Sequence, residues 1–235
     1  MTELRTPAQA VEAVLTAAVV VDQDLDKGVG SWTHEEVDHG WEVDGEEVLG
    51  IYRPMESPGV ATLYAGRIAR FFHFHVMAGL TAASAPMTHE DVEALRRWTV
   101  VAVVEHEIFH HLCDRVRHQP SGRTCVPEVE EPLACGWSWH RTLSHPLASD
   151  VWRSPLMTTW PNAAAAPLFA ERRLRSYPSA PYRDWHLEGR DRRSGWVRHA
   201  SGYLEVEPTT VRQRLFDLTD EALAGTPHLI WRVIP

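Results

Sequence analysis

Hydrophobic residues recur at helical spacing in two stretches of the chain. The first stretch begins after residues 6–9, Thr-Pro-Ala-Gln, which are typical of a capped helix start. Its apolar face consists of Val11, Val14, Leu15, Ala18 and Val19. The second stretch, residues 92–112, is apolar on nearly all sides and follows Thr88 and Asp91, which are spaced as in a capping box. We expect it to be a helix buried at the centre of a domain.

Three shorter segments show the pattern of β-strands. Residues 47–53 and 60–65 are separated by a turn-rich segment, and residues 228–234 form a third candidate strand. Residues 66–80 alternate in part like a strand, but their large apolar residues also share one helical face. We expect a helix there, because the run is long.

The segments after residue 145 give weaker signals. Prolines make residues 146–162 loop-like, and residues 163–175 can form a helix. Residues 189–202 are charged and are expected to be flexible, whereas residues 207–218 begin with Glu-Pro-Thr, a helix start. Taken together, the pattern predicts an α+β fold that is mainly helical.

Length and composition favour a single domain. A chain of 235 residues, 44% of them hydrophobic, can bury a sizeable core. We expect one domain over residues 1–235, with a core at 46–143 and a C-terminal extension at 146–235. The formal net charge of −9, without any basic run, argues against a nucleic-acid partner.

The sequence also bears on compartment and redox chemistry. It has no apolar run long enough to span a membrane, and its N-terminus lacks the pattern of an export signal, so we expect a cytoplasmic protein without a membrane partner. Cys113, Cys125 and Cys135 are an odd number of cysteines, which argues against a disulfide framework. We interpret them as small buried thiols rather than metal ligands. No feature indicates an oligomeric state.

The candidate chemistry is concentrated at residues 106–110, His-Glu-Ile-Phe-His, which have the pattern H-E-x-x-H. Histidines four residues apart lie one above the other on a helix, so both rings can reach one ion. Glu107 is then placed to take a proton from a water molecule at the metal. Burying these groups in an apolar helix costs free energy unless they are paired or bind a metal. The pattern predicts a metal site, and a hydrogen-bonded His–Glu cluster is the alternative.

A catalytic zinc ion takes three protein ligands, so a third has to come from another part of the chain. Asp114 lies roughly two helical turns beyond His106, which is too far along the axis. A helix stop at residues 118–122 is followed by acidic residues and a proline. This predicts a second helix over about residues 132–143, with Glu130 and Glu131 at its start.

With these features the chain resembles the gluzincin metallopeptidases, in which a Glu on a second helix, in the form E-x-x-A, follows H-E-x-x-H. Residues 131–134, Glu-Pro-Leu-Ala, have this form. The resemblance implies that His106, His110 and Glu131 hold one Zn²⁺ per chain. Glu130 remains the alternative third ligand, and Glu128 is less favoured.

The order of elements over residues 46–143 also resembles that of small cytoplasmic zincin-like proteins of bacteria. This resemblance implies a zincin-like fold, with an active-site helix and a Glu-bearing second helix against a small sheet. It further implies a zinc-dependent hydrolase that cleaves a peptide or another small amide-containing substrate, with Glu107 as general base. Tyr182 and His186, in the aromatic segment 177–186, are candidates for stabilising the oxyanion.

Two other functions remain open at this point. One is an enzyme that uses a zincin fold on a small molecule, by hydrolysis, elimination or cyclisation. The other is a non-catalytic scaffold or regulatory protein stabilised by its metal, in which a side chain such as Cys135 blocks the fourth metal position. Fold-level resemblance does not separate these functions, because function depends on the site.

Overall fold

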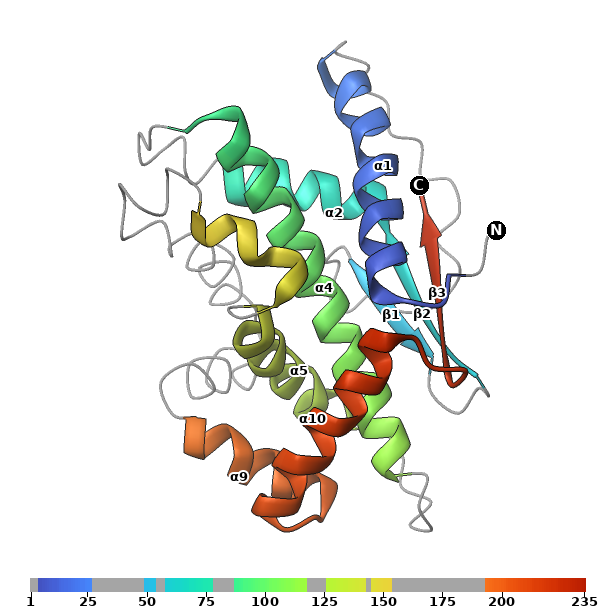
Figure 1. Ribbon diagram of the computed structural model, residues 1–235, viewed down its shortest axis with the longest axis vertical. Coiled ribbons are helices and arrows are strands. Elements are labelled where there is room, and N and C mark those ends of the chain that lie inside the picture. The colour runs from blue at the N-terminus through green and yellow to red at the C-terminus, as the bar shows by residue number, and fades with distance from the viewer. Residues whose placement is uncertain are drawn as a thin grey trace.

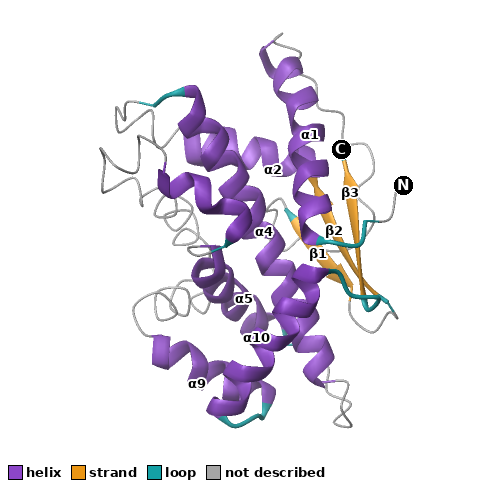
Figure 2. Cartoon of the chain, in the orientation of Figure 1, coloured by secondary structure: helices purple, strands orange, loops and turns teal. Residues whose placement is uncertain are grey.

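The computed structural model describes seven stretches of the chain, which make up a mainly helical molecule with one small sheet (Figure 2). This content of helices and strands confirms the predicted α+β class. The described residues are 4–26, 49–53, 58–77, 87–117, 126–142, 145–153 and 193–235.

Helix α4 (His89–Arg117) runs through the middle of the molecule, with α1 (Pro7–Asp26) and the sheet on one side and further helices on the other (Figure 1). The predicted capping box is present at its start. The N–H of Thr88 donates to Asp91 Oδ2 at 2.7 Å, and the N–H of Asp91 donates to Thr88 Oγ1 at 3.2 Å. Most apolar side chains of α4 are buried, as predicted for a central helix.

The N-terminal elements pack on α4 through their apolar faces. In α1, Thr6 and Gln9 form the predicted reciprocal cap, and Val11 and Val14 are fully buried. The segment after residue 64 is helical, as expected, and consists of α2 (Ala65–Phe71) and the π-helix η1 (Phe72–Met77).

The sheet joins segments from both ends of the described chain. Its strands β1 (Gly50–Arg53), β2 (Gly59–Tyr64) and β3 (Leu229–Ile234) lie in that order, which confirms the three predicted strands. β1 pairs antiparallel with β2, and β3 pairs parallel with β2. The C-terminal part of the chain therefore completes the sheet that residues 50–64 begin.

The second helix, α5 (Pro127–Thr142), starts earlier than predicted. Its first turn is closed by the carbonyl of Val126, which accepts from the N–H groups of Val129 and Glu130 at 3.0 and 2.9 Å. Pro127 thus takes the first helical position, where a missing N–H costs nothing, while Pro132 lies inside the helix. Glu130 and Glu131 accordingly project from within α5 rather than from the segment before it.

Two corrections concern the later segments. Residues 146–153 were expected in a loop but form the 3₁₀ helix η2 (Pro146–Arg153), and the expected flexible segment contains α9 (Arg193–Leu204). Helix α9 buries Ala200 and Leu204, and this packing outweighs its polar composition. The last helix is confirmed and extends further, as α10 (Pro208–Ala224). The helix predicted at 163–175 lies outside the described residues.

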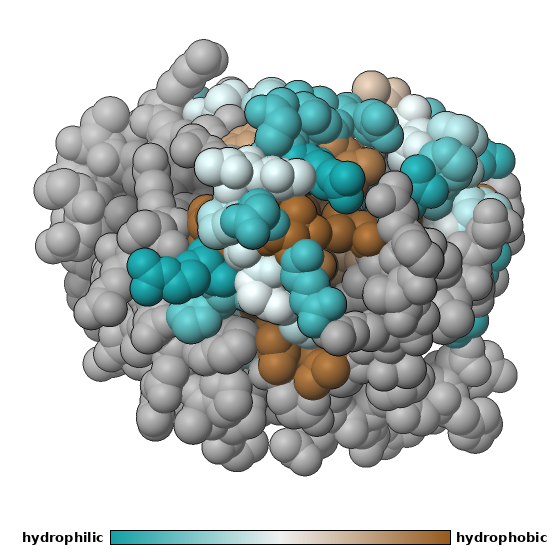
Figure 3. Space-filling view, turned by 90° about the horizontal axis from the view of Figure 1, so that it is seen from below, coloured by the Kyte–Doolittle hydropathy of each residue, from teal (hydrophilic) through white to brown (hydrophobic). Residues whose placement is uncertain are grey.

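On the face shown in Figure 3, hydrophobic residues gather near the centre and at the lower edge of the described area, with hydrophilic residues around them. Large hydrophobic side chains that are exposed in the described part of the chain belong to Val126 and Phe216. None of the described helices is both long and apolar enough to cross a bilayer.

Trp231 of β3 tests whether the C-terminal strand belongs to the core. Its side chain is fully buried, so Trp231→Ala should lower the free energy of unfolding by about 3–5 kcal/mol. Urea denaturation measures this loss. Phe216→Ala, at a partly exposed aromatic residue of α10, serves as control and should cost much less. Equal losses for the two variants would mean that β3 is not integral to the core.

Candidate metal centre

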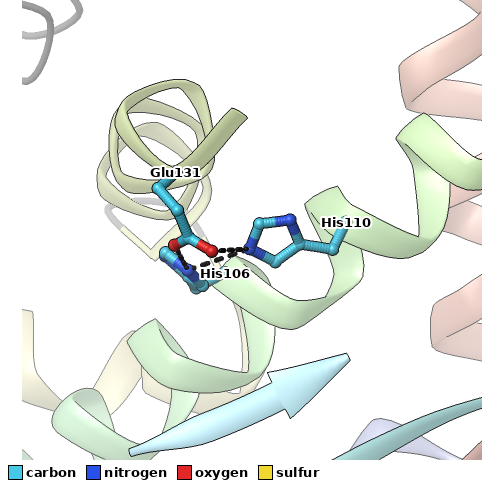
Figure 4. Close-up of side chains that lie close together, drawn as sticks. All are labelled: His106, His110 and Glu131. Atoms are coloured by element: carbon cyan, nitrogen blue, oxygen red, sulfur yellow. Dashed lines mark hydrogen bonds and ion pairs between the residues drawn. The ribbon is translucent and has the colours of Figure 1, made fainter. Parts of the chain in front are cut away.

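Three side chains from two helices converge between α4 and α5. His106 and His110 lie one turn apart on α4 and point toward Glu131 of α5 (Figure 4). Their Nε2 atoms are 3.1 Å apart. Glu131 Oε2 lies 2.9 Å from His106 Nε2, and Glu131 Oε1 lies 3.3 Å from His110 Nε2. The ligand atoms all lie within 4.8 Å of one another.

The donor set fits a divalent cation. Two imidazole nitrogens and one carboxylate oxygen are a ligand set of catalytic zinc sites, in which a fourth position is left for water or substrate. The lone pairs of the two Nε2 atoms repel each other at this separation, unless one nitrogen carries a proton or both nitrogens bind the same cation. Among the described residues, no fourth His, Cys, Asp or Glu belongs to this group.

Glu130, the alternative third ligand, does not lie beside the two Nε2 atoms. Its Oε1 lies 2.8 Å from Nδ1 of His110, the ring nitrogen on the far side from the group. An ionised carboxylate can only accept, so Nδ1 donates its hydrogen to Glu130, and Nε2 is the ring nitrogen directed at the group. This is the carboxylate–histidine arrangement that orients ligands in metal sites. The geometry thus favours Glu131 as the third ligand and Glu130 as the group that fixes the ring of His110.

Cys135 and Ser138 of α5 do not extend the ligand group. Cys135 Sγ lies 3.8 Å from Nδ1 of His106, the ring nitrogen that is not directed at Glu131. Ser138 donates to the backbone carbonyl of Ala102 and so packs α5 on α4. Cys135 is therefore a neighbour of a candidate ligand rather than a member of the group.

Protons compete for the same nitrogens. Burial alone would lower the pKa of His106, but hydrogen bonds with Cys135 and Glu131 outweigh burial and raise this pKa to about 10. Burial is likewise outweighed at His110, whose pKa is raised well above its usual value by Glu131 and Glu130. Burial would raise the pKa of Glu131, yet the two imidazoles hold it well below its usual range. Without a metal, protonated imidazole therefore neutralises the carboxylate.

Glu107 lies against strand β1 and is 3% exposed. A Cβ atom added to Gly50 would come within 2.6 Å of Glu107 Oε1, so the carboxylate occupies the space that this glycine leaves open. The backbone N–H of Tyr52 hydrogen-bonds to the carboxylate. Its other oxygen, Oε2, is buried without a hydrogen-bond partner among the described residues. Burial raises the pKa of Glu107 above its usual value, against the opposing effect of the neighbouring histidines.

Tyr52 connects β1 to the part of α4 that follows Glu107. Its hydroxyl donates to Asp114 Oδ2 at 2.7 Å and lies 3.3 Å from Nδ1 of His111. Asp114 thus anchors the strand and lies outside the ligand group, as expected. Gly50 and Tyr52 contact site residues although no sequence motif marks them, because both contacts depend on how β1 packs on α4.

The remaining carboxylate of this part of α4, Glu105, is fully buried on a different side of the helix. The indole N–H of Trp137 donates to its Oε2 at 3.1 Å, and Nε2 of His145 lies 3.2 Å from its Oε1. The N–H of Leu147 donates to Nδ1 of His145, which leaves the ring hydrogen on Nε2, facing Glu105. Burial raises the pKa of Glu105 to about 7. These contacts join α4, α5 and η2.

The two residues proposed to stabilise the oxyanion, Tyr182 and His186, lie outside the described residues. Comparison with known proteins gave no match: no protein family, no curated protein and no solved structure matches this chain. The function of this protein therefore has to be inferred from the geometry of the site itself.

Metal content tests the ligand group. Protein purified without added metal should contain about one zinc per chain, and Glu131→Gln should lose most of it, because the amide offers a weaker donor in place of a charged oxygen. Glu93→Gln, at an exposed carboxylate of α4, is the matched control and should keep its metal. Elemental analysis gives the answer. Wild-type protein that neither contains nor takes up zinc would leave only a hydrogen-bonded cluster.

The raised pKa values predict that zinc binding releases protons. His106 has a pKa of about 10 in the metal-free protein, so it must lose a proton to bind metal at neutral pH. The apparent affinity should therefore rise between pH 6 and 8, by about tenfold per pH unit for each proton displaced. Calorimetry in buffers of different protonation enthalpy measures the protons released. An affinity that is independent of pH over this range would contradict the assignment.

Proposed function

We propose that this protein is a zinc-dependent hydrolase that cleaves a peptide or another amide bond. The observation that carries the proposal is that the buried carboxylate of Glu107 interacts electrostatically with all three members of the group, His106, His110 and Glu131. The buried Oε2 of Glu107 has no partner among the described residues, as expected for a base that awaits a proton. The resemblance to gluzincin metallopeptidases at H-E-x-x-H and residues 131–134 supports the same reading.

The proposed reaction assigns roles to the residues of the chain. His106, His110 and Glu131 would hold Zn²⁺, which supplies Lewis-acid chemistry to a carbonyl oxygen and to water. Glu107 accepts a proton from the attacking water and later returns it to the leaving amine. Strand β1 excludes bulk water from one side of Glu107, and the N–H of Tyr52 orients its carboxylate.

The position of Cys135 favours an enzyme over a metal-stabilised scaffold. A scaffold would be expected to fill the fourth metal position with a protein side chain. Cys135 was the side chain considered for that position, but its Sγ contacts Nδ1 of His106, which does not face Glu131. His106 and Glu131 also keep 21% and 31% of their side-chain surface exposed, so the group is not fully buried.

Substitution of the base tests the proposal. Glu107→Gln keeps the size of the side chain but cannot take up a proton, so turnover should fall by about 10²–10⁴-fold while zinc content stays the same. Cleavage of a mixed peptide library, followed by mass spectrometry, measures turnover, and elemental analysis measures zinc. Unchanged cleavage by a zinc-loaded Glu107→Gln variant would exclude this mechanism.

Gly50 offers a second way to displace the same base. In Gly50→Ala the added Cβ would meet Glu107 Oε1 at 2.6 Å and push the carboxylate out of place, so turnover should fall without loss of zinc. Gly66→Ala is the matched control, since its Cβ would meet only ordinary contacts at 3.7 Å. Equal turnover of the two variants would show that the position of β1 does not matter to the base.

A further inference from the structure

The hydroxyl group of Tyr203 connects helix α9 to the candidate metal centre. It donates to Glu130 Oε2 at 2.6 Å and accepts from the backbone N–H of Val126 at 3.2 Å. The other oxygen of Glu130 lies 2.8 Å from Nδ1 of His110. The ring of a candidate ligand is therefore held, through one carboxylate, by a residue 73 positions further along the chain than Glu130.

Chemistry sets the direction of each hydrogen bond in this series. An ionised carboxylate only accepts, so Tyr203 and His110 both donate to Glu130. With Nδ1 held by Glu130, Nε2 is the ring nitrogen of His110 that faces Glu131 and could bind a metal. The side chain of Glu130 is 4% exposed, so water cannot readily replace a lost partner there.

The helix that carries Tyr203 is fixed to the same region by packing. α9 contacts both α5 and α4, and it buries Ala200 and Leu204. Tyr203 itself reaches the first turn of α5, where Val126 also accepts the first backbone hydrogen bonds of that helix. The start of α5, which positions Glu130 and Glu131, is thus in contact with the C-terminal part of the chain.

We propose that Tyr203 is a positioning residue of the metal centre, and that docking of α9 and metal binding by His106, His110 and Glu131 strengthen each other. A metal that fixes the ring of His110 also fixes Glu130, which is the acceptor for Tyr203. Such coupling is reciprocal, so a docked α9 raises metal affinity by the same factor by which metal favours docking. This inference rests on the metal centre and does not require hydrolytic activity.

Tyr203→Phe tests the first half of the proposal, because it removes the hydroxyl group and keeps the ring. Its affinity for Zn²⁺, measured by competition with a chromophoric chelator, should fall by about tenfold relative to wild type. Tyr64→Phe loses the same hydroxyl group at the end of β2, outside the centre, and should bind zinc like wild type. Equal affinities for wild type and Tyr203→Phe would overturn the proposal and leave the metal centre in place.

A double-mutant cycle shows whether Tyr203 acts through Glu130. Tyr203 and His110 donate to different oxygens of Glu130, and in Glu130→Gln one of these oxygens is replaced by an NH2 group that cannot accept, so one of the two hydrogen bonds is lost. In the Glu130→Gln background, Tyr203→Phe should therefore change zinc affinity very little. A full loss on top of Glu130→Gln would mean that Tyr203 acts by another route, and would overturn the proposal.

Hydrogen exchange tests the second half. Added Zn²⁺ should slow amide exchange across α9 in wild type, and should slow it much less in Tyr203→Phe. An exchange rate in α9 that zinc does not change in wild type would exclude the coupling. If wild-type protein binds no zinc in the chelator assay, this proposal fails together with the metal centre, whereas absence of hydrolysis alone leaves it intact.

Discussion

The structure depends on the cost of burying polar side chains in one long helix. α4 runs through the apolar interior, and yet Glu105, Glu107, His110 and His111 on it are all buried. Each buried charge or imidazole has to be paired, protonated or bound to a cation. Their partners come from β1, α5 and η2, so the same side chains that could hold and serve a metal also fix the elements around α4.

Local patterns were sufficient to predict much of this arrangement. The caps at Thr6 and Thr88 and the apolar positions of α4 depend on neighbouring residues, so the sequence displays them directly. The pairing of His106 with His110 is local in the same sense, since four residues make one turn. The structure confirms the predicted helices and strands as far as the end of α4, and it brings the two histidines and Glu131 together.

The features that the sequence did not predict depend on contacts between distant segments of the chain. Spacing alone could not separate Glu130 from Glu131, because successive helical residues point about 100° apart and the orientation of α5 decides which one faces the group. The predicted helix start at Pro132 was wrong, because α5 begins at Pro127. Gly50, Tyr52 and Tyr203 act through strand and helix packing, for which a single sequence gives no signal.

The parallel pairing of β2 with β3 has a consequence for the order in which the chain can fold. The two strands are separated by all the residues that form α2, α4, α5, α9 and α10, and pairings over such distances are slow to form. During synthesis from the N-terminus, the segment with His106, His110 and Glu131 leaves the ribosome before β3 does. A nascent chain that has not yet reached residue 229 therefore already carries the candidate metal ligands, while the sheet that packs against Glu107 is still unfinished.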